Sequence, residues 1–332
     1  MKWLTFTRIL LVALLLLAIL CLNLEKDIFK ATLYIRNRTR TYGLLDQKRT
    51  AERIQSERIA TLKSYCRTND TKTTEFPTRR RFIVNERYKL LYCQVFKTGS
   101  TTTLTILHNL EHNDRRNTHD MREQLNDLPF KRLNTYSDEE VRFRFETYTK
   151  LIIVRNPLER LVSAWEDKFS YAPSRFGYRK QYHSMLKTLL SNTSNTELGP
   201  FKLLPEGTDN RSYPIVPFPA FIKAVGTNRT EWQDPHWQLI SDLCAPCQID
   251  YDFIMHTETI AEDYQLFFRK AGIVGREYLI PEVRQRKGDR LFWDFYKEIP
   301  MEDLWQIKQK FKVDYDMFGY NFHDDIVRFF SR

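Results

Sequence analysis

The sequence of this chain predicts an α/β fold, with a central parallel sheet flanked by helices. Two segments, 89–110 and 151–169, support this prediction, because each has an apolar run, a polar loop and then helical periodicity. The apolar run of the second segment does not alternate with polar residues, which is typical of a strand buried on both faces. Another strand is predicted from Ile249 to Met255, and aromatic residues from Leu291 through Tyr320 predict a closing helix pair.

The composition is that of an ordered protein with acidic partners. The 332 residues allow one large domain or two small ones. Only 10 residues are glycine and 14% are aromatic, which favours a well-packed core over low-complexity sequence. The net charge of +10 favours nucleic acid, an anionic membrane or a polyanionic glycan, and charge alone does not choose among them.

The N-terminus predicts a membrane anchor. Ile9 to Leu22 is an unbroken apolar run, preceded by Lys2 and Arg8. It is long enough for a thin bilayer and no small-x-small site follows, so we favour an uncleaved anchor over a cleaved signal peptide. The flanking charges place the rest of the chain in the lumen, as in a type II membrane protein. The predicted organisation is a cytoplasmic tail at 1–8, an anchor at 9–24, a stem at 25–75 and a lumenal domain at 76–332.

The sequence between the anchor and the first core strand is polar and basic. Leu44 to Tyr65 could form a polar helix, although its apolar residues make a poor heptad for a coiled-coil dimer. Arg79 to Arg81 then form a basic run, which we interpret as a solvated face.

Glycosylation sequons and cysteines fit a lumenal chain. Five N-x-S/T sequons together argue against nuclear DNA binding. In an oxidising compartment, the four cysteines beyond the anchor allow three disulfide pairings, and the sequence selects none. Their Cys-x-x-Cys pair could be half of a zinc site, but no second pair exists, so disulfides or paired thiols are favoured. The sequons are at Asn37, Asn69, Asn192, Asn210 and Asn228, and the cysteines are Cys66, Cys93, Cys244 and Cys247.

The first strand–loop–helix segment offers an anion-binding loop. Lys89 to Phe96 has the length and residue types of a strand, and a helix begins near Leu104. The loop from Lys97 to Thr103 supplies one lysine, one glycine that allows close backbone approach, and a row of hydroxyls, which suits a phosphate or sulfonate. The pattern GxxxxGK[ST] is absent, which disfavours ATP or GTP with Mg²⁺. The alternative is a threonine-rich turn with an exposed lysine.

The second segment offers another anion site. Its strand runs from Leu151 to Arg155, and its helix starts with Asn156 as cap and Pro157 at the first position. Arg155 and Ser163 fall outside the apolar stripe that we expect to pack on the sheet. A guanidinium group and a hydroxyl near a helix N-terminus suit an anion. The alternative is a surface arginine and a helix serine without a role in binding. The stripe consists of Leu158, Leu161, Val162, Trp165 and Phe169.

Two separated anion sites suit a ligand with two phosphate groups. In a lumenal protein without a Mg²⁺-type loop, 3′-phosphoadenosine 5′-phosphosulfate (PAPS) fits better than a nucleoside triphosphate. The 5′-phosphosulfate loop of Golgi carbohydrate sulfotransferases is similar to CQVFKTGSTTTLTIL, and their 3′-phosphate motif closely resembles IVRNPLERLVSAWEDKF. The members that include chondroitin and dermatan 4-O-sulfotransferases are also similar at HWQLISDLCAPCQIDYDFIMHTET and VDYDMFGY. This resemblance implies a P-loop-like sulfotransferase fold.

The resemblance also implies roles for the loop residues. Lys97 would stabilise the charge that develops on the bridging oxygen as the sulfuryl group leaves. Backbone amides with Ser100 and Thr101 would hold the 5′-phosphate, and Arg155 and Ser163 would hold the 3′-phosphate. The implied donor-binding set is Lys97, Thr98, Gly99, Ser100, Thr101, Thr102, Arg155 and Ser163.

A general base must take the proton of the acceptor hydroxyl. His236 lies in the HW stretch of the family, and His119 precedes the second motif much as a catalytic histidine does in uronyl 2-O-sulfotransferases. We favour His236, with His119 and acidic residues such as Glu166 as alternatives.

The implied function is that of a Golgi type II sulfotransferase acting on glycosaminoglycan, with the 4-O position of chondroitin as the expected target. The first loop looks more like the PKTAST form of uronyl 2-O-sulfotransferases, so heparan and N-glycans stay open as acceptors. A catalytically silent glycan-binding module is the alternative from another class, and the retained Lys97, Arg155 and Ser163 argue against it. PAPS without a metal is the expected co-substrate, nucleic acid is not an expected partner, and a homodimer is possible.

Overall fold

The structure is a computed structural model that describes residues 49–69, 79–116, 128, 130–169, 217–227, 233–281 and 294–330. From residue 54 onward the chain forms one compact unit. The predicted anchor at 9–24, His119 and the sequons other than Asn69 lie outside the described residues. No helix in the described ranges has the length and apolar character needed to cross a bilayer.

Four short strands form a mixed sheet in the order β1-β2-β3-β4. β2, β3 and β4 are parallel, as predicted, but β1 is antiparallel to β2. The expectation of an all-parallel sheet is therefore wrong at this edge. Only residues 86–89 connect β1 to β2, and so short a turn joins antiparallel strands. The strands are β1 Phe82–Asn85, β2 Leu90–Cys93, β3 Thr149–Val154 and β4 Phe253–His256.

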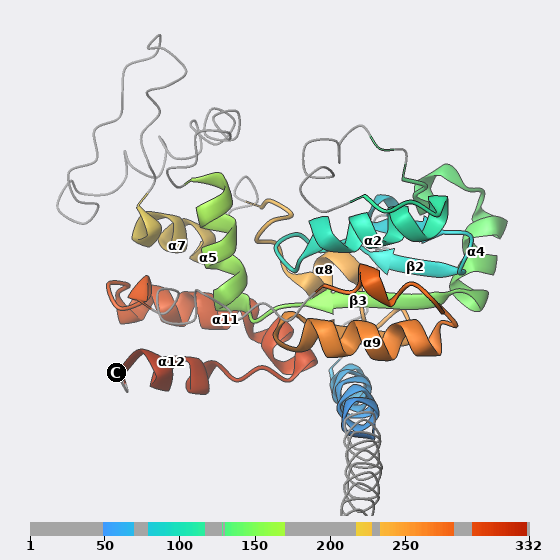
Figure 1. Ribbon diagram of the computed structural model, residues 1–332. Helices are drawn as coiled ribbons and strands as arrows, with labels where there is room; N and C mark the ends of the chain where they lie inside the picture. The colour runs from blue at the N-terminus through green and yellow to red at the C-terminus, as the bar shows by residue number, and fades with distance from the viewer. Residues whose placement is uncertain are drawn as a thin grey trace, which may run out of the picture. The chain divides into compact units, whose positions relative to one another are not determined.

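A helix follows each parallel strand: α2 after β2, α5 after β3 and α9 after β4. Since parallel strands end at the same edge, the loops that lead into these helices are neighbours. Three further helices, α7, α11 and α12, gather with α5 at one end of the sheet (Figure 1). The helices are α2 Ser100–His112, α4 Asp138–Thr147, α5 Pro157–Lys168, α7 Phe218–Gly226, α8 Ile240–Cys244, α9 Ile260–Lys270, α11 Met301–Phe318 and α12 Phe322–Phe330, with 3-10 turns η1 Arg79–Arg81, η2 Leu133–Thr135, η5 Thr257–Thr259 and η6 Glu277–Leu279.

The apolar stripe of α5 is buried, but its partner differs from the expected one. Leu158, Leu161 and Val162 pack with residues of α7 and α11 in one hydrophobic cluster, and the sheet belongs to a second cluster. The expectation that the stripe packs on the sheet is therefore wrong. α5 follows the end of β3, and its apolar face packs against other helices. The predicted closing helices contribute residues to that contact.

A helix at residues 49–68 confirms the predicted polar helix, and from residue 54 it belongs to the folded unit. Its Leu62 is 4% exposed and packs in the cluster that covers the sheet. Arg58 donates to both carboxylate oxygens of Asp263 on α9, at 2.9 and 2.8 Å. The unit therefore includes part of the segment that the sequence presents as a stem.

Two disulfides settle the choice among the three possible pairings. Cys66 at the end of the N-terminal helix joins Cys247, and Cys93 at the end of β2 joins Cys244. The Cys-x-x-Cys pair is thus divided between two disulfides. The second disulfide is fixed immediately before the β2–α2 loop, so it anchors the strand from which that loop departs.

Replacing both Cys66 and Cys247 with serine is expected to lower the free energy of unfolding by about 2–5 kcal/mol. The reason is that this disulfide joins residues 181 positions apart and so closes a long loop, which restricts the unfolded chain. Urea denaturation of the full chain followed by tryptophan fluorescence measures the change. Cys21→Ser is the matched control, and an unchanged midpoint in the double variant would contradict the expectation.

Candidate active site

The loop from β2 to α2 has a backbone suited to an anion. Lys97 and Gly99 have positive φ angles of 70° and 82°, which glycine adopts freely and lysine rarely. Gly99 is the N-cap of α2 without a side-chain cap, and no atom lies within 4 Å of the position where a Cβ would be. The first N–H groups of α2 lack helical partners, as at the start of any helix, and the side of Gly99 where a Cβ would lie is open. Thr98 is buried, and its hydroxyl donates to the carbonyl of Val95 at 2.9 Å, so it shapes the loop.

The start of α5 forms as the sequence predicts and holds Arg155 against this loop. The side-chain oxygen of Asn156 accepts from the backbone N–H of Leu158 at 2.9 Å, and Pro157 is the first helical residue. Arg155 Nε lies 3.2 Å from the carboxylate of Glu159, and Arg155 Nη1 donates to the carbonyl of Lys97 at 3.2 Å. The two predicted anion sites are therefore adjacent, and Arg155 connects them.

Ser163 lies two turns further along α5 and is half-buried, as a position outside the apolar stripe should be. Its hydroxyl has no hydrogen-bond partner among the described residues. Ser100, Thr101 and Thr102 are likewise half-buried in the first turn of α2. These four hydroxyls remain available to a ligand.

A charged cluster surrounds the side chain of Lys97. Its ammonium nitrogen lies 3.2 Å from Asp167 Oδ2, and the nitrogen of Lys168 lies 3.1 Å from the same oxygen. Lys168 is 5% exposed, and the side chains of Lys97 and Asp167 are each 16% exposed. Two cations thus share one carboxylate at the last turn of α5, beside the loop.

His236 is held in a geometry that suits a general base. Its Nδ1 lies 2.5 Å from Asp234 Oδ1, which also accepts the backbone N–H of His236 at 2.8 Å. An Nδ1–H donated to this carboxylate leaves Nε2 as the acceptor nitrogen. Burial lowers the pKa of His236 from 6.5, the nearby charges of Lys168 and Lys97 lower it further, and the hydrogen bond to Asp234 opposes the change. The imidazole is therefore neutral at pH 7.

Arg160 brings His236 and the β2–α2 loop together. This α5 side chain is 2% exposed and donates to three backbone carbonyls: Phe96 at 3.1 Å, Gln238 at 2.6 Å and Pro235 at 3.0 Å. Burial lowers its pKa to about 10, which still leaves it charged at pH 7. The same contacts bring the rings of His236 and Phe96 into a stack with centroids 4.4 Å apart.

Arg160→Met is expected to destabilise the fold by about 3 kcal/mol or more, because three carbonyls lose their donor and each buried unsatisfied group costs about 1–3 kcal/mol. It should also lower kcat, because His236 is no longer fixed relative to Lys97. Arg160→Lys keeps the charge but not the forked geometry, so a partial loss is expected. Chemical denaturation with parallel activity assays measures both effects. A methionine variant as stable and active as the parent would contradict this role.

The structure brings together most of the predicted site and adds four residues to it. Lys97, Arg155 and His236 lie around the β2–α2 loop, whereas His119 lies outside the described residues. Glu166 is exposed on α5, and its place as an alternative base stays a prediction. The four added residues, which the predicted site does not include, are Arg160, Asp167, Lys168 and Asp234. The first three lie within the segment that resembles the 3′-phosphate motif. Their positions on the predicted helix are the only feature of the sequence that could have indicated them.

Within the described ranges, no three histidine, cysteine or acidic side chains gather in a way that could hold a metal ion.

Comparison with known proteins gives one consistent set of matches. The model of a family described as the sulfotransferase family matches residues 80–321. Carbohydrate sulfotransferase 12 of Xenopus laevis is 28% identical over 86% of this chain and 72% of the relative. Carbohydrate sulfotransferase 10 of Homo sapiens is 28% identical over 82% of this chain and 78% of the relative. Carbohydrate sulfotransferase 11 of Rattus norvegicus is 30% identical over 73% of this chain and 67% of the relative.

No solved structure matches the chain significantly. The family match nevertheless spans the sheet, both predicted anion-binding loops and His236. This chain belongs to the sulfotransferase family, and its curated relatives are carbohydrate sulfotransferases.

Proposed function

We propose that this chain transfers a sulfuryl group from PAPS to a hydroxyl of a glycosaminoglycan, with the 4-O position of chondroitin as the first candidate. One observation carries the proposal: Arg155 links two anion-binding loops at the ends of the adjacent parallel strands β2 and β3. Two such loops suit a donor with phosphate groups at two points. The names of the curated relatives support a carbohydrate acceptor.

The residues around the β2–α2 loop fit the donor. The open side of Gly99 and the first N–H groups of α2 would receive the 5′-phosphate, together with the hydroxyls of Ser100 and Thr101. Arg155 and Ser163 would hold the 3′-phosphate. When bound, PAPS supplies an activated sulfuryl group and a bisphosphate leaving group.

Two side chains would act on the reacting atoms. Lys97 would stabilise the negative charge that develops on the leaving oxygen, from within a cluster in which Lys97 and Lys168 both pair with Asp167. His236 would accept the acceptor hydroxyl proton at Nε2, while Asp234 holds Nδ1–H and stabilises the imidazolium that forms. In such transfers, positioning and charge stabilisation supply most of the rate.

The location of the protein belongs to the same proposal. The apolar run at 9–24 would anchor the chain in the Golgi membrane as a type II protein, with the active site in the lumen. The two disulfides support an oxidising compartment for the folded unit.

The test is transfer of radiolabelled sulfate from PAPS by the full chain to desulfated chondroitin, heparosan and N-glycans side by side. We expect label in chondroitin and none with Lys97→Ala. Label in heparosan or N-glycans alone would mean that the proposed acceptor is wrong and the proposed reaction is right. No transfer to any acceptor, together with no binding of adenosine 3′,5′-bisphosphate, would overturn the proposal.

A further inference from the structure

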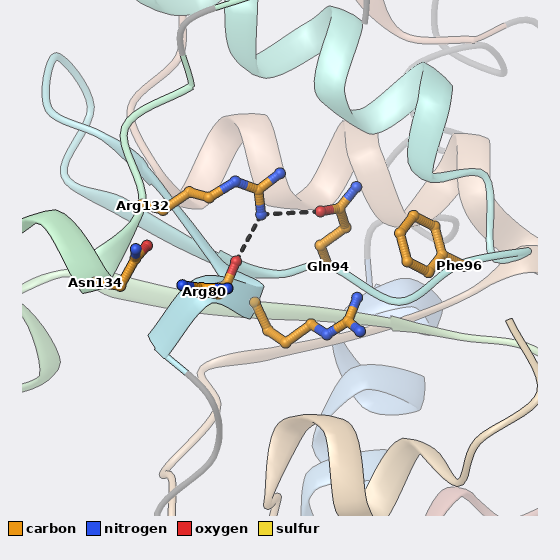
Figure 2. Close-up of a pocket in the computed structure, with 6 residues that line it drawn as sticks. Arg80, Gln94, Phe96, Arg132 and Asn134 are labelled. Atoms are coloured by element: carbon orange, nitrogen blue, oxygen red, sulfur yellow. Dashed lines mark hydrogen bonds between the residues drawn. The ribbon is translucent and has the colours of Figure 1, made fainter. Parts of the chain in front are cut away.

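A pocket of about 500 Å³ opens beside the loop that follows β2. η1, η2 and the end of β2 provide its walls, and Figure 2 shows Arg132 pointing between Arg80 and Gln94. Three of its lining residues are arginines and none is acidic. The pocket is lined by Arg80, Arg81, Gln94, Phe96, Arg132 and Asn134, and we call it the arginine pocket.

The arginine pocket has a concentrated positive charge. Among the described residues, no carboxylate makes a salt bridge with Arg80, Arg81 or Arg132. Burial lowers the pKa of Arg81, the charge of Arg132 lowers it further, and Asp234 opposes the change. Burial also lowers the pKa of Arg132. Partly desolvated arginines close to one another cost free energy in the empty protein, and an anion between them would recover it.

The orientation of Arg132 is fixed by hydrogen bonds to uncharged groups. Its Nη1 donates to the carbonyl of Arg80 at 2.6 Å and to Gln94 Oε1 at 3.1 Å (Figure 2). The other guanidinium nitrogens remain as donors in a preset plane. Such a fork binds a carboxylate or a sulfate group through two parallel hydrogen bonds.

One aromatic side chain connects the arginine pocket to the proposed base. The ring of Phe96 stacks on His236 with centroids 4.4 Å apart, and the guanidinium carbon of Arg81 lies 5.3 Å from the centroid of the same ring. Phe96 also precedes Lys97 in the chain. A group bound in the pocket is therefore near the hydroxyl that His236 would deprotonate, but it occupies a different position.

We propose that the arginine pocket binds an acidic group, a carboxylate or a sulfate ester, on the sugar residue next to the one that receives the sulfuryl group. This inference rests on the proposed function and specifies its acceptor: a glycan with an acidic substituent on the neighbouring residue. The donor phosphates are not candidates for the pocket, because the first turn of α2, Arg155 and Ser163 provide their sites.

The test uses the full-length variant Arg80→Gln/Arg81→Gln, with Arg79→Gln as the matched control. Arg79 belongs to the same turn η1 but pairs with the exposed Asp138 at 2.6 Å, outside the pocket. Three chondroitin hexasaccharides serve as probes: one with carboxylates only, one carboxyl-reduced with sulfate esters, and one carboxyl-reduced without sulfate. Direct binding is measured by fluorescence anisotropy at fixed ionic strength in the presence of adenosine 3′,5′-bisphosphate.

We expect the double variant to bind at least one acidic probe about 10- to 100-fold more weakly, since two charge-assisted contacts are lost. Its affinity for the neutral probe and for adenosine 3′,5′-bisphosphate should stay within about twofold of the parent, as should every affinity of Arg79→Gln. The acidic probe that loses affinity identifies the group as carboxylate or sulfate.

Three results would overturn the inference: equal losses for acidic and neutral probes, weakened bisphosphate binding, or no loss at all. Arg81→Lys, which keeps the charge, should bind the acidic probes more tightly than Arg81→Gln and guards against a folding defect. Because binding needs no turnover, a failure of the proposed transfer reaction would be seen separately from a failure of this pocket.

Discussion

Replacing Lys97 with alanine is expected to lower kcat about 10²- to 10³-fold, the loss typical of removing one preorganised group that stabilises developing charge. Lys97 sits between β2 and α2 with a φ of 70°, a conformation that the surrounding loop must hold in place. Its side chain is only 16% exposed, so its charge is weakly screened by water. The loss should therefore appear mainly in kcat, because the leaving oxygen gains its charge in the transition state.

The measurement is steady-state sulfuryl transfer with the donor and the acceptor varied in turn. Lys312→Ala removes an exposed lysine on α11 that pairs with Asp316, and it should leave kcat unchanged. Lys97→Arg keeps the charge but changes its shape and reach, so we expect an intermediate kcat. If Lys97→Ala raised the donor KM and left kcat intact, Lys97 would be a binding residue, and the role proposed for it would be wrong.

Local rules predict the parts of this site that adjacent residues determine. Asn156 and Pro157 form the start of α5 as expected, because capping and proline geometry depend on a few neighbouring residues. Gly99 permits the left-handed turn before α2 for the same reason. The parallel order of β2, β3 and β4 also follows from strand–loop–helix segments, each of which requires a crossover.

Contacts between distant segments could not be read from the same rules. Arg160 joins carbonyls 64 and 78 residues away, and its sequence position shows only that it lies on a helix near the second anion site. The His236–Asp234 pair is local, but its place beside Lys97 depends on that arginine. The basic run of η1 predicts a solvated face, yet Arg81 lines a pocket, because the antiparallel β1 brings the turn to the end of β2.

Replacing His236 with glutamine is expected to lower kcat by about 10²- to 10⁴-fold, the usual contribution of a positioned general base. The parent should lose activity as the pH falls through the pKa of His236, because only the neutral imidazole accepts a proton. Burial and the charges of Lys168 and Lys97 hold that pKa below 6.5 in the donor-free protein, with Asp234 opposing them. Activity should therefore persist below the pH at which an ordinary histidine becomes protonated.

In His236→Gln, the fall of kcat/KM at low pH (the acid limb of the pH profile) should disappear along with most of the rate. NMR titration of the free parent protein should place the pKa of His236 below 6.5. Asp234→Asn provides a second test, because it removes the carboxylate that fixes the Nδ1–H tautomer while the imidazole remains, and a large fall in kcat is expected. His323→Gln changes an exposed histidine on α12 and should alter neither the rate nor the pH profile. A His236→Gln enzyme that kept both the parental rate and the acid limb would show that another group takes the acceptor proton, with His119 the next residue to replace.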